Sequence, residues 1–201
     1  MAEVRKLAPI ILKWEAGVPP EKYVCANVSK PITLEEQWVE AVKKGFSNHP
    51  NDTGGATMCG ITLKTYTSYC KKKGRKEPTV DDLKKISLCE WLDVLKSLYW
   101  DKMKADKINN QSIANLCVDN VWGSGSGYIK NIQRVLGVTA DGIVGDQTLS
   151  AINNHPNQRE LFGKLWERRR MFYVNLTVSR PSDQVFLKGW MNRLYDFKYS
   201  E

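Results

Sequence analysis

The sequence is poor in the residues that hold metals and form disulfides. Its 201 residues include two histidines, His49 and His155, and five widely spaced cysteines without a C-x-x-C pair. A zinc amidase needs several histidine ligands, so two distant histidines argue against that class of enzyme. An odd number of scattered cysteines argues against a disulfide framework and against a thiolate zinc site. We therefore expect reduced, mostly buried thiols and no metal or organic cofactor.

Long hydrophobic runs are also absent. No stretch reaches the roughly 18 apolar residues that a transmembrane helix requires. Residues 1–6 lead into a segment that carries Lys13 and Glu15 rather than into the apolar core of a signal peptide. We expect a protein that is synthesised in the cytoplasm without a signal peptide and does not insert stably into a membrane.

The chain has no internal repeats, but it has an excess of basic residues. It contains 30 Lys and Arg residues against 22 Asp and Glu residues, a net charge of +8. This excess predicts an anionic partner such as nucleic acid, an acidic membrane surface or the polymers of a bacterial cell wall. The basic residues are scattered, with short clusters at 71–73 and 168–170, and form no basic recognition helix. Charge alone therefore does not identify the partner.

Hydrophobic residues recur at spacings of three and four along most of the chain, which predicts an all-α protein. Thr33 with Glu36 and Ser87 with Glu90 form capping-box patterns that mark the starts of two helices. Only the region at 48–61 is rich in Gly, Asn, Asp and Pro and lacks helical periodicity, so we expect at most a short hairpin there. Further helices are expected at 63–73, 80–86, 112–122, 127–136, 146–153, 158–176 and 184–195.

A polar stretch at 105–110 divides the chain into an N-terminal part, 1–106, and a C-terminal part, 107–201. The stretch is too short to act as a flexible linker. Hydrophobic residues make up 42% of the sequence, enough for a substantial core. We expect the two parts to pack together as one body, with a possible cleft between them.

Glu15 ends an apolar helical run, where a carboxylate is electrostatically unfavourable. The run covers residues 10–17, and Gly17 is placed to cap the end of the helix. A negative charge in the last turn opposes the helix dipole, and partial burial beside Trp14 also disfavours the ionised form. A carboxylic acid that stays protonated can donate a proton to a leaving group. A half-exposed glutamate at a frayed helix end would show the same pattern.

Residues 45–62 combine glycines with short polar side chains. The pair Gly54 and Gly55 permits positive φ and close approach of the backbone. Such loops often only turn the chain, although short side chains can also bind a sugar hydroxyl or position a water molecule. The polar residues with this potential are Asn48, Asp52, Thr57 and Thr62.

Three motifs together resemble a known family. They are W-E-x-G at 14–17, N-x-P-x-D-x-G-G-A-T-x-x-G-I-T at 48–62, and Y-W-D at 99–101. In this order they resemble the glycoside hydrolase family 108 domain of bacterial and phage N-acetylmuramidases. The second half resembles the peptidoglycan-binding domain of the same proteins, and some members are described as secretion activators. The matching positions in the second half are 112–115, 119, 122, 125, 133–145, 189–190 and 192–193.

The resemblance implies a lysozyme-like helical scaffold that hydrolyses the β-1,4 bond between N-acetylmuramic acid and N-acetylglucosamine. The family's catalytic glutamate maps onto Glu15, which would protonate the departing oxygen. Asp52 is the candidate for a second carboxylate, and a turn-capping role explains it equally well. Thr62 could orient the attacking water or simply cap the helix that follows.

Four further residues are candidates for substrate binding together with Thr62. Core packing is a competing explanation for the aromatic ones. The chain also departs from the family: Ala16 replaces a glycine, and residues 18–44 form an insertion that adds the rival carboxylate Glu40. The four further candidates are Thr57, Tyr66, Asp119 and Trp122.

Other classes fit the sequence less well. A cysteine peptidase would pair Cys59 with His49, but no third orienting residue is evident. A nucleic-acid-binding protein would be supported by charge alone, so we expect bacterial peptidoglycan and no nucleic acid as partner. The main alternative is a non-catalytic protein that binds peptidoglycan or assists secretion. A holin-like pore, a secretion partner or cell lysis would each allow action at the cell wall.

Overall fold

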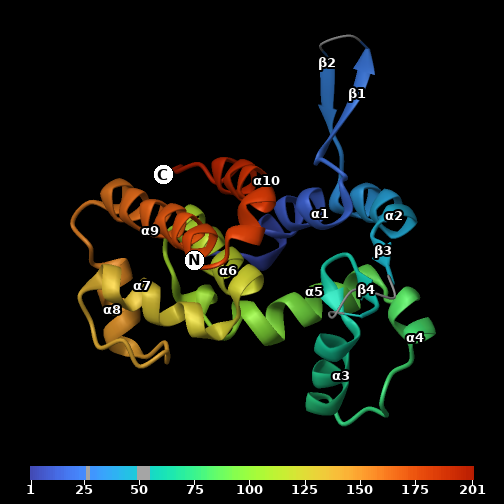
Figure 1. Cartoon of the computed structure of the whole chain (residues 1–201), viewed down its shortest axis with the longest axis horizontal. Helices are drawn as coiled ribbons and strands as arrows, with labels where there is room; N and C mark the ends of the chain where they lie inside the picture. Colours follow the sequence, from blue (N-terminus) through green and yellow to red (C-terminus); the bar gives the residue numbers. More distant parts are fainter. Residues whose placement is uncertain (26–27, 49–54) are drawn as a thin grey trace. The chain divides into compact units, whose positions relative to one another are not determined.

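The computed structural model describes residues 1–25, 28–48 and 55–201 (Figure 1). The chain forms two compact units, which we call the N-terminal unit, Arg5–Leu98, and the C-terminal unit, Met1–Val4 with Tyr99–Glu201. The chain passes from one unit to the other within a π-helical turn, η2 (Lys96–Trp100), and the predicted domain division at 105–110 stays a prediction. Helical structure dominates both units, as the hydrophobic spacing predicted.

The N-terminal unit contains five α-helices in its described residues. The capping box at Thr33 and Glu36 opens α2 as predicted, because each side chain accepts a hydrogen bond from the other residue's backbone N–H. Trp91 and Leu95 are completely buried, so the last of the five helices lies in the core. The helices are α1 (Ala8–Ala16), α2 (Leu34–Lys44), α3 (Leu63–Lys72), α4 (Val80–Lys84) and α5 (Leu88–Leu95).

Two small antiparallel sheets complete the described N-terminal unit. One has the order β3-β4-β5, with β3 (Phe46–Ser47), β4 (Thr57–Met58) and β5 (Ile61–Thr62), and its β4–β5 hairpin was expected. The other is a hairpin of β1 (Glu21–Cys25) and β2 (Val28–Pro31), which extends away from α1 and α2 (Figure 1). The sequence prediction of at most one short hairpin near 48–61 did not include it. Lysine, glutamate and proline are depleted in strands and hid its pattern.

The C-terminal unit is built around α6 (Gln111–Ser124), in which all residues from Ser112 to Val121 are buried. A helix buried on all sides is expected at the centre of a helical domain. The helix α9 is the longest and packs against α6, α7 and α10. The remaining elements are η1 (Val4–Lys6, at the boundary), η3 (Ala105–Lys107), η4 (Ser126–Tyr128), α7 (Ile129–Leu136), α8 (Asp146–Asn153), α9 (Gln158–Ser179), η5 (Pro181–Asp183) and α10 (Gln184–Tyr195).

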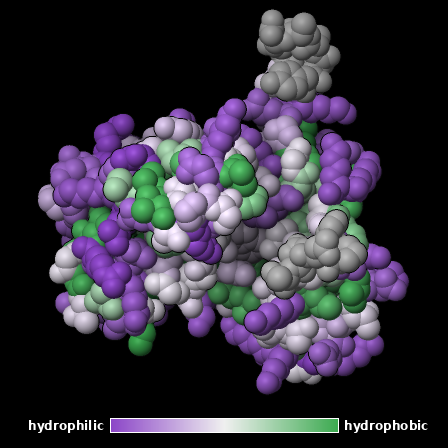
Figure 2. Space-filling view, in the orientation of Figure 1, coloured by the Kyte–Doolittle hydropathy of each residue, from purple (hydrophilic) through white to green (hydrophobic). Residues whose placement is uncertain are grey.

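The face of the molecule shown in Figure 2 is largely hydrophilic. Figure 2 shows polar and charged residues over much of the visible face, with hydrophobic residues in small groups. None of the helices in the described part of the chain combines the length and hydrophobicity of a membrane span. Among the cysteines with described side chains, Cys59, Cys70 and Cys117 are buried and Cys89 is exposed.

Candidate active site

Glu15 lies in the last turn of α1, where the sequence predicted it. Gly17 ends the helix in the left-handed conformation, with φ 66° and ψ 24°. Ile11, Leu12 and Ala16 are buried, whereas Glu15 itself is half-buried. The helix therefore anchors its apolar side in the core and holds the Glu15 carboxyl group at the edge of that core.

The hairpin between β4 and β5 has a two-residue turn, Cys59 and Gly60. Met58 pairs with Ile61 across it, and both turn residues have positive φ, 45° for Cys59 and 81° for Gly60. These are the features of a type I′ turn, the common connection of tight hairpins. Met58 and Ile61, which flank the turn, are buried, so core packing fixes both ends of the turn.

The Glu15 carboxyl group lies directly against Gly60. A Cβ atom placed on Gly60 would be 2.7 Å from Cγ and Cδ of Glu15 and 2.8 Å from its Oε2. Any other residue at position 60 would therefore collide with the carboxyl group. The W-E-x-G motif and the G-I-T motif, which are far apart in the sequence, meet at this contact.

A second glycine, Gly45, joins this turn to α1 and α2. A Cβ atom there would be 2.4 Å from Cys59 Sγ, 2.9 Å from the Ala41 carbonyl oxygen and 3.2 Å from Ala16 Cβ. The Cys59 N–H donates a hydrogen bond of 2.8 Å to the Gly45 carbonyl. Because three chain segments converge on Gly45, the position of the turn relative to Glu15 is tightly constrained.

Cys59 has the environment of a structural thiol. Burial raises its pKa to about 12, and the negative charge of Glu15 adds to this effect. A nucleophilic cysteine needs the opposite, a lowered pKa that stabilises the thiolate. The geometry thus gives no support to a cysteine peptidase. His49, its suggested partner, lies outside the described residues.

Thr57 and Thr62 face each other across the β4–β5 hairpin and are both half-buried. Their side chains share the face of the hairpin opposite to that of the buried Met58 and Ile61. The Thr62 hydroxyl accepts a hydrogen bond of 3.1 Å from the Thr65 N–H and so caps α3. Their roles in substrate binding stay predictions. Asp52 lies outside the described residues.

Tyr66 is buried between α3 and α5. Its hydroxyl donates a hydrogen bond of 3.0 Å to Glu90, which also pairs with Arg75. Burial, with the hydrogen bond to Glu90 as second cause, raises the pKa of Tyr66. Its ring stacks on Tyr69 at a centroid distance of 6.1 Å. The hydrogen bond to Glu90 links α3 to α5, and the role of Tyr66 in substrate binding stays a prediction.

Asp119 and Trp122, the candidates from the C-terminal unit, also have partners within that unit. Asp119 is buried and accepts two hydrogen bonds from Arg193, of 2.7 and 3.1 Å. The half-buried Trp122 ring lies against Tyr99, with centroids 4.7 Å apart. The resemblance listed Arg193 and Asp119 as separate motif residues, and the structure joins them in one ion pair.

Glu40, the rival to Glu15, is an exposed residue of α2. Its carboxylate pairs with Lys43 at 2.8 Å. The hydrogen bond from Lys43 lowers the pKa of Glu40. A proton donor at neutral pH needs the opposite change, so the surroundings of Glu40 do not favour it as a general acid.

The glycine-rich motif at 133–145 covers the last turn of α7 and the loop that leads to α8, and the buried Gln133 lies in that last turn. The Gln133 side chain donates hydrogen bonds to Asp141 at 2.8 Å and to the Ile143 carbonyl at 3.0 Å. It also accepts a bond of 2.8 Å from the Gly142 N–H. The motif therefore stabilises the fold of the C-terminal unit, because the Gln133 side chain forms hydrogen bonds with residues 141–143 of the loop.

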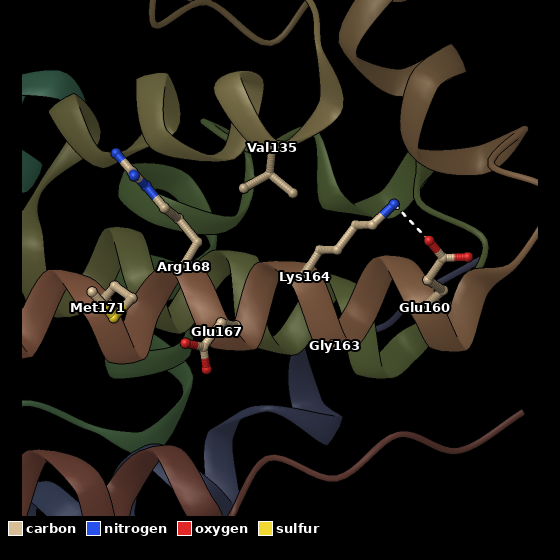
Figure 3. Close-up of a pocket in the computed structure, with 7 residues that line it drawn as sticks. All are labelled: Val135, Glu160, Gly163, Lys164, Glu167, Arg168 and Met171. Atoms are coloured by element: carbon tan, nitrogen blue, oxygen red, sulfur yellow. Dashed lines mark ion pairs between the residues drawn. The ribbon is translucent and has the colours of Figure 1, made fainter.

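A surface groove of about 550 Å³ lies between α7 and α9 (Figure 3). Val135 projects into it from α7, and Gly163 and Met171 line it on α9. The charged side chains around it have partners: Lys164, for example, pairs with Glu160 at 2.6 Å. The groove therefore offers a mainly apolar surface bordered by paired charges.

Comparison with known proteins identifies the domains. The profile of a family described as glycosyl hydrolase 108 matches residues 37–125, and that of a predicted peptidoglycan domain matches residues 128–195. Residues 37–125 of this chain thus carry a glycosyl hydrolase 108 domain. The solved structure of Brucella abortus SagA is similar, with 28% identity and a TM-score of 0.62 over 76% of this chain and 82% of that chain. Among curated proteins, none matches the chain.

With these two matches, the chain combines a domain related to peptidoglycan with a domain of a glycoside hydrolase family. The match covers the β4–β5 hairpin but begins at Gln37, after Glu15 and most of the 18–44 insertion. The case for Glu15 therefore depends on its contact with Gly60. Sequence reasoning missed the importance of Gly45 and Gly60, although the G-I-T motif contained a signal for Gly60.

Proposed function

We propose that this chain is an N-acetylmuramidase that hydrolyses the β-1,4 bond between N-acetylmuramic acid and N-acetylglucosamine in bacterial peptidoglycan. Glu15 is the general acid. The observation that supports this assignment most is the contact between the Glu15 carboxyl group and Gly60 of the G-I-T motif. It brings the one carboxylate of the W-E-x-G motif to the hairpin that lies within the family match.

In this mechanism Glu15 protonates the departing glycosidic oxygen while positive charge develops on the sugar ring. The hydroxyl groups of Thr57 and Thr62 lie on the same hairpin and would contact the substrate or the attacking water. Asp52 is the candidate base. The net charge of +8 would hold the enzyme on the anionic wall, which it reaches after export or lysis.

The test compares wild type, Glu15→Gln and Glu40→Gln on purified cell-wall sacculi. Both variants remove one carboxylate by the same substitution, but only Glu15 contacts the hairpin. We expect reducing ends to appear with wild type and Glu40→Gln, and a loss of at least about 10²-fold with Glu15→Gln, since general acid catalysis contributes that much. Equal rates for wild type and Glu15→Gln would refute the assignment of Glu15.

The bond that is cleaved can be identified from the products. Reduction of the new ends with borohydride, followed by acid hydrolysis, gives muramitol after muramidase cleavage and glucosaminitol after glucosaminidase cleavage. We expect muramitol. Glucosaminitol would keep the glycoside hydrolase class but refute the proposed bond.

A second candidate function is peptidoglycan binding without turnover, as in a protein that assists secretion. The match of residues 128–195 to a predicted peptidoglycan domain favours it. Co-sedimentation with sacculi measures this binding directly. Wild-type protein that sediments with sacculi and releases no reducing ends would support this function over the muramidase.

A further inference from the structure

Trp91 of α5 donates a buried hydrogen bond to the turn that carries Gly60. Its ring is completely buried, and its indole N–H lies 3.0 Å from the Cys59 carbonyl oxygen. Trp91 belongs to none of the motifs that carry the family resemblance. A buried indole N–H needs an acceptor, and this one uses a backbone oxygen only one residue from the Glu15 contact.

The acceptor is the carbonyl of the peptide group between Cys59 and Gly60. This peptide group is planar, so fixing the direction of its carbonyl also fixes the N–H of Gly60 and restricts the position of its Cα. Type I′ and type II′ turns differ in the orientation of this central peptide group. The hydrogen bond from Trp91 therefore selects the orientation in which Gly60 faces Glu15.

The same turn also contacts α2 and the residue that follows it, Gly45. The Cys59 N–H donates to the Gly45 carbonyl at 2.8 Å, and Cys59 Sγ lies 3.6 Å from the Ala41 carbonyl oxygen. Trp38 of α2 packs against Trp91 with ring centroids 5.7 Å apart. Trp91 and the C-terminal part of α2 thus both contact Cys59, and of these contacts the Trp91 bond acts on the peptide group that leads into Gly60.

We infer that Trp91 is a positioning residue for Glu15, acting through the Cys59–Gly60 peptide group. This inference rests on the proposed function. Without the indole N–H the peptide group loses its buried partner and can rotate, which moves Gly60 relative to the Glu15 carboxyl group. Misplacement of a catalytic group by about 1 Å can cost about 10²-fold in rate. We therefore expect a loss of about 10- to 100-fold in kcat with little change in KM.

The experiment compares the single variants Trp91→Phe and Trp38→Phe with wild type, using soluble peptidoglycan glycan fragments as substrate. Both variants replace one indole ring of the packed Trp38–Trp91 pair by a smaller phenyl ring, but only Trp91→Phe removes the hydrogen bond to the turn. We expect similar losses of thermal stability, a lower kcat only for Trp91→Phe, and a shift of the alkaline limb of its kcat–pH profile. That limb reports deprotonation of the general acid.

Benzothienylalanine incorporated at position 91 provides a second variant that keeps the ring size and removes only the N–H donor. We expect it to fold like wild type and to show the same fall in kcat as Trp91→Phe. Wild-type kcat in this variant, or equal losses in Trp91→Phe and Trp38→Phe, would overturn the inference alone. Full activity in Glu15→Gln would instead overturn the proposed function, and the inference with it.

Discussion

Replacing Gly60 by alanine tests the contact that defines the candidate site. Gly60 has φ 81°, and an added Cβ would lie 2.7 Å from the Glu15 side chain. Gly55 is a matched control, because its φ is 68° and an added Cβ would meet no atom within 4 Å. Both Gly60→Ala and Gly55→Ala therefore introduce the same backbone strain, but only the first displaces Glu15.

The two variants should differ in activity more than in stability. An L-residue in the left-handed conformation costs about 1–2 kcal/mol, so both should lose about this much free energy of unfolding. At Gly60 the Glu15 side chain must also shift, and a χ angle displaced by about 30° from its rotamer adds about 0.5–1.5 kcal/mol. Because the carboxyl group moves by about 1 Å, kcat should fall by about 10²-fold. That fall corresponds to about 2.7 kcal/mol in the activation free energy.

Urea unfolding gives the free energies of unfolding, and initial rates of reducing-end release from soluble glycan fragments give kcat. Gly55→Ala should keep a kcat close to that of wild type once corrected for the folded fraction. Equal kcat values for the two variants would refute the reasoning, because the contact with Glu15 would then have no bearing on catalysis. A Gly60→Ala variant with wild-type stability would contradict the expected cost of an L-residue at the positive φ of position 60.

Two further predictions concern ion pairs away from the Gly60 turn. Asp119→Asn should reduce the free energy of unfolding by about 3 kcal/mol in thermal or urea unfolding, because it removes the buried negative charge that pairs with the half-buried Arg193 guanidinium. A loss below about 0.5 kcal/mol would contradict this structural role. The hydrogen bond from Lys73 lowers the pKa of Asp93 below its ordinary value of 3.8, so the ionised form stabilises the fold above pH 3.8 and this contribution is lost as the pH falls through the lowered pKa. In acid unfolding, the stability gap between wild type and Asp93→Asn should therefore close as the pH falls through the lowered pKa. The exposed control Asp81→Asn should not show this change, and an equal change in it would contradict the prediction.

The local features of the fold could be predicted from sequence. Hydrophobic spacing indicated the helices, and Gly17 ends α1 as its position suggested, because helix formation and capping depend on residues within a few positions of each other. Thr33 and Glu36 form a full capping box for the same reason. The turn-forming residues of 48–61 likewise indicated a short hairpin, and β4 and β5 form it.

Distant contacts changed some local expectations. Ser87 caps α5, but the Glu90 carboxylate accepts from Tyr66 and pairs with Arg75. Tertiary partners thus determined where this carboxylate points, although its sequence spacing fitted a capping box. The β1–β2 hairpin in the insertion was also missed, since its strands contain residues that are depleted in sheets.

The sequence by itself determined the helical class, the end of α1 at Gly17 and the candidacy of Glu15, because each depends on neighbouring residues and on charge. Only the tertiary structure decided that Glu15 lies on Gly60, that Trp91 holds the turn and that Asp119 pairs with Arg193. The physical reason is that these contacts join residues far apart in the chain. Whether a glycine is required at position 60 depends on which atoms occupy the space beside it, and packing alone sets that.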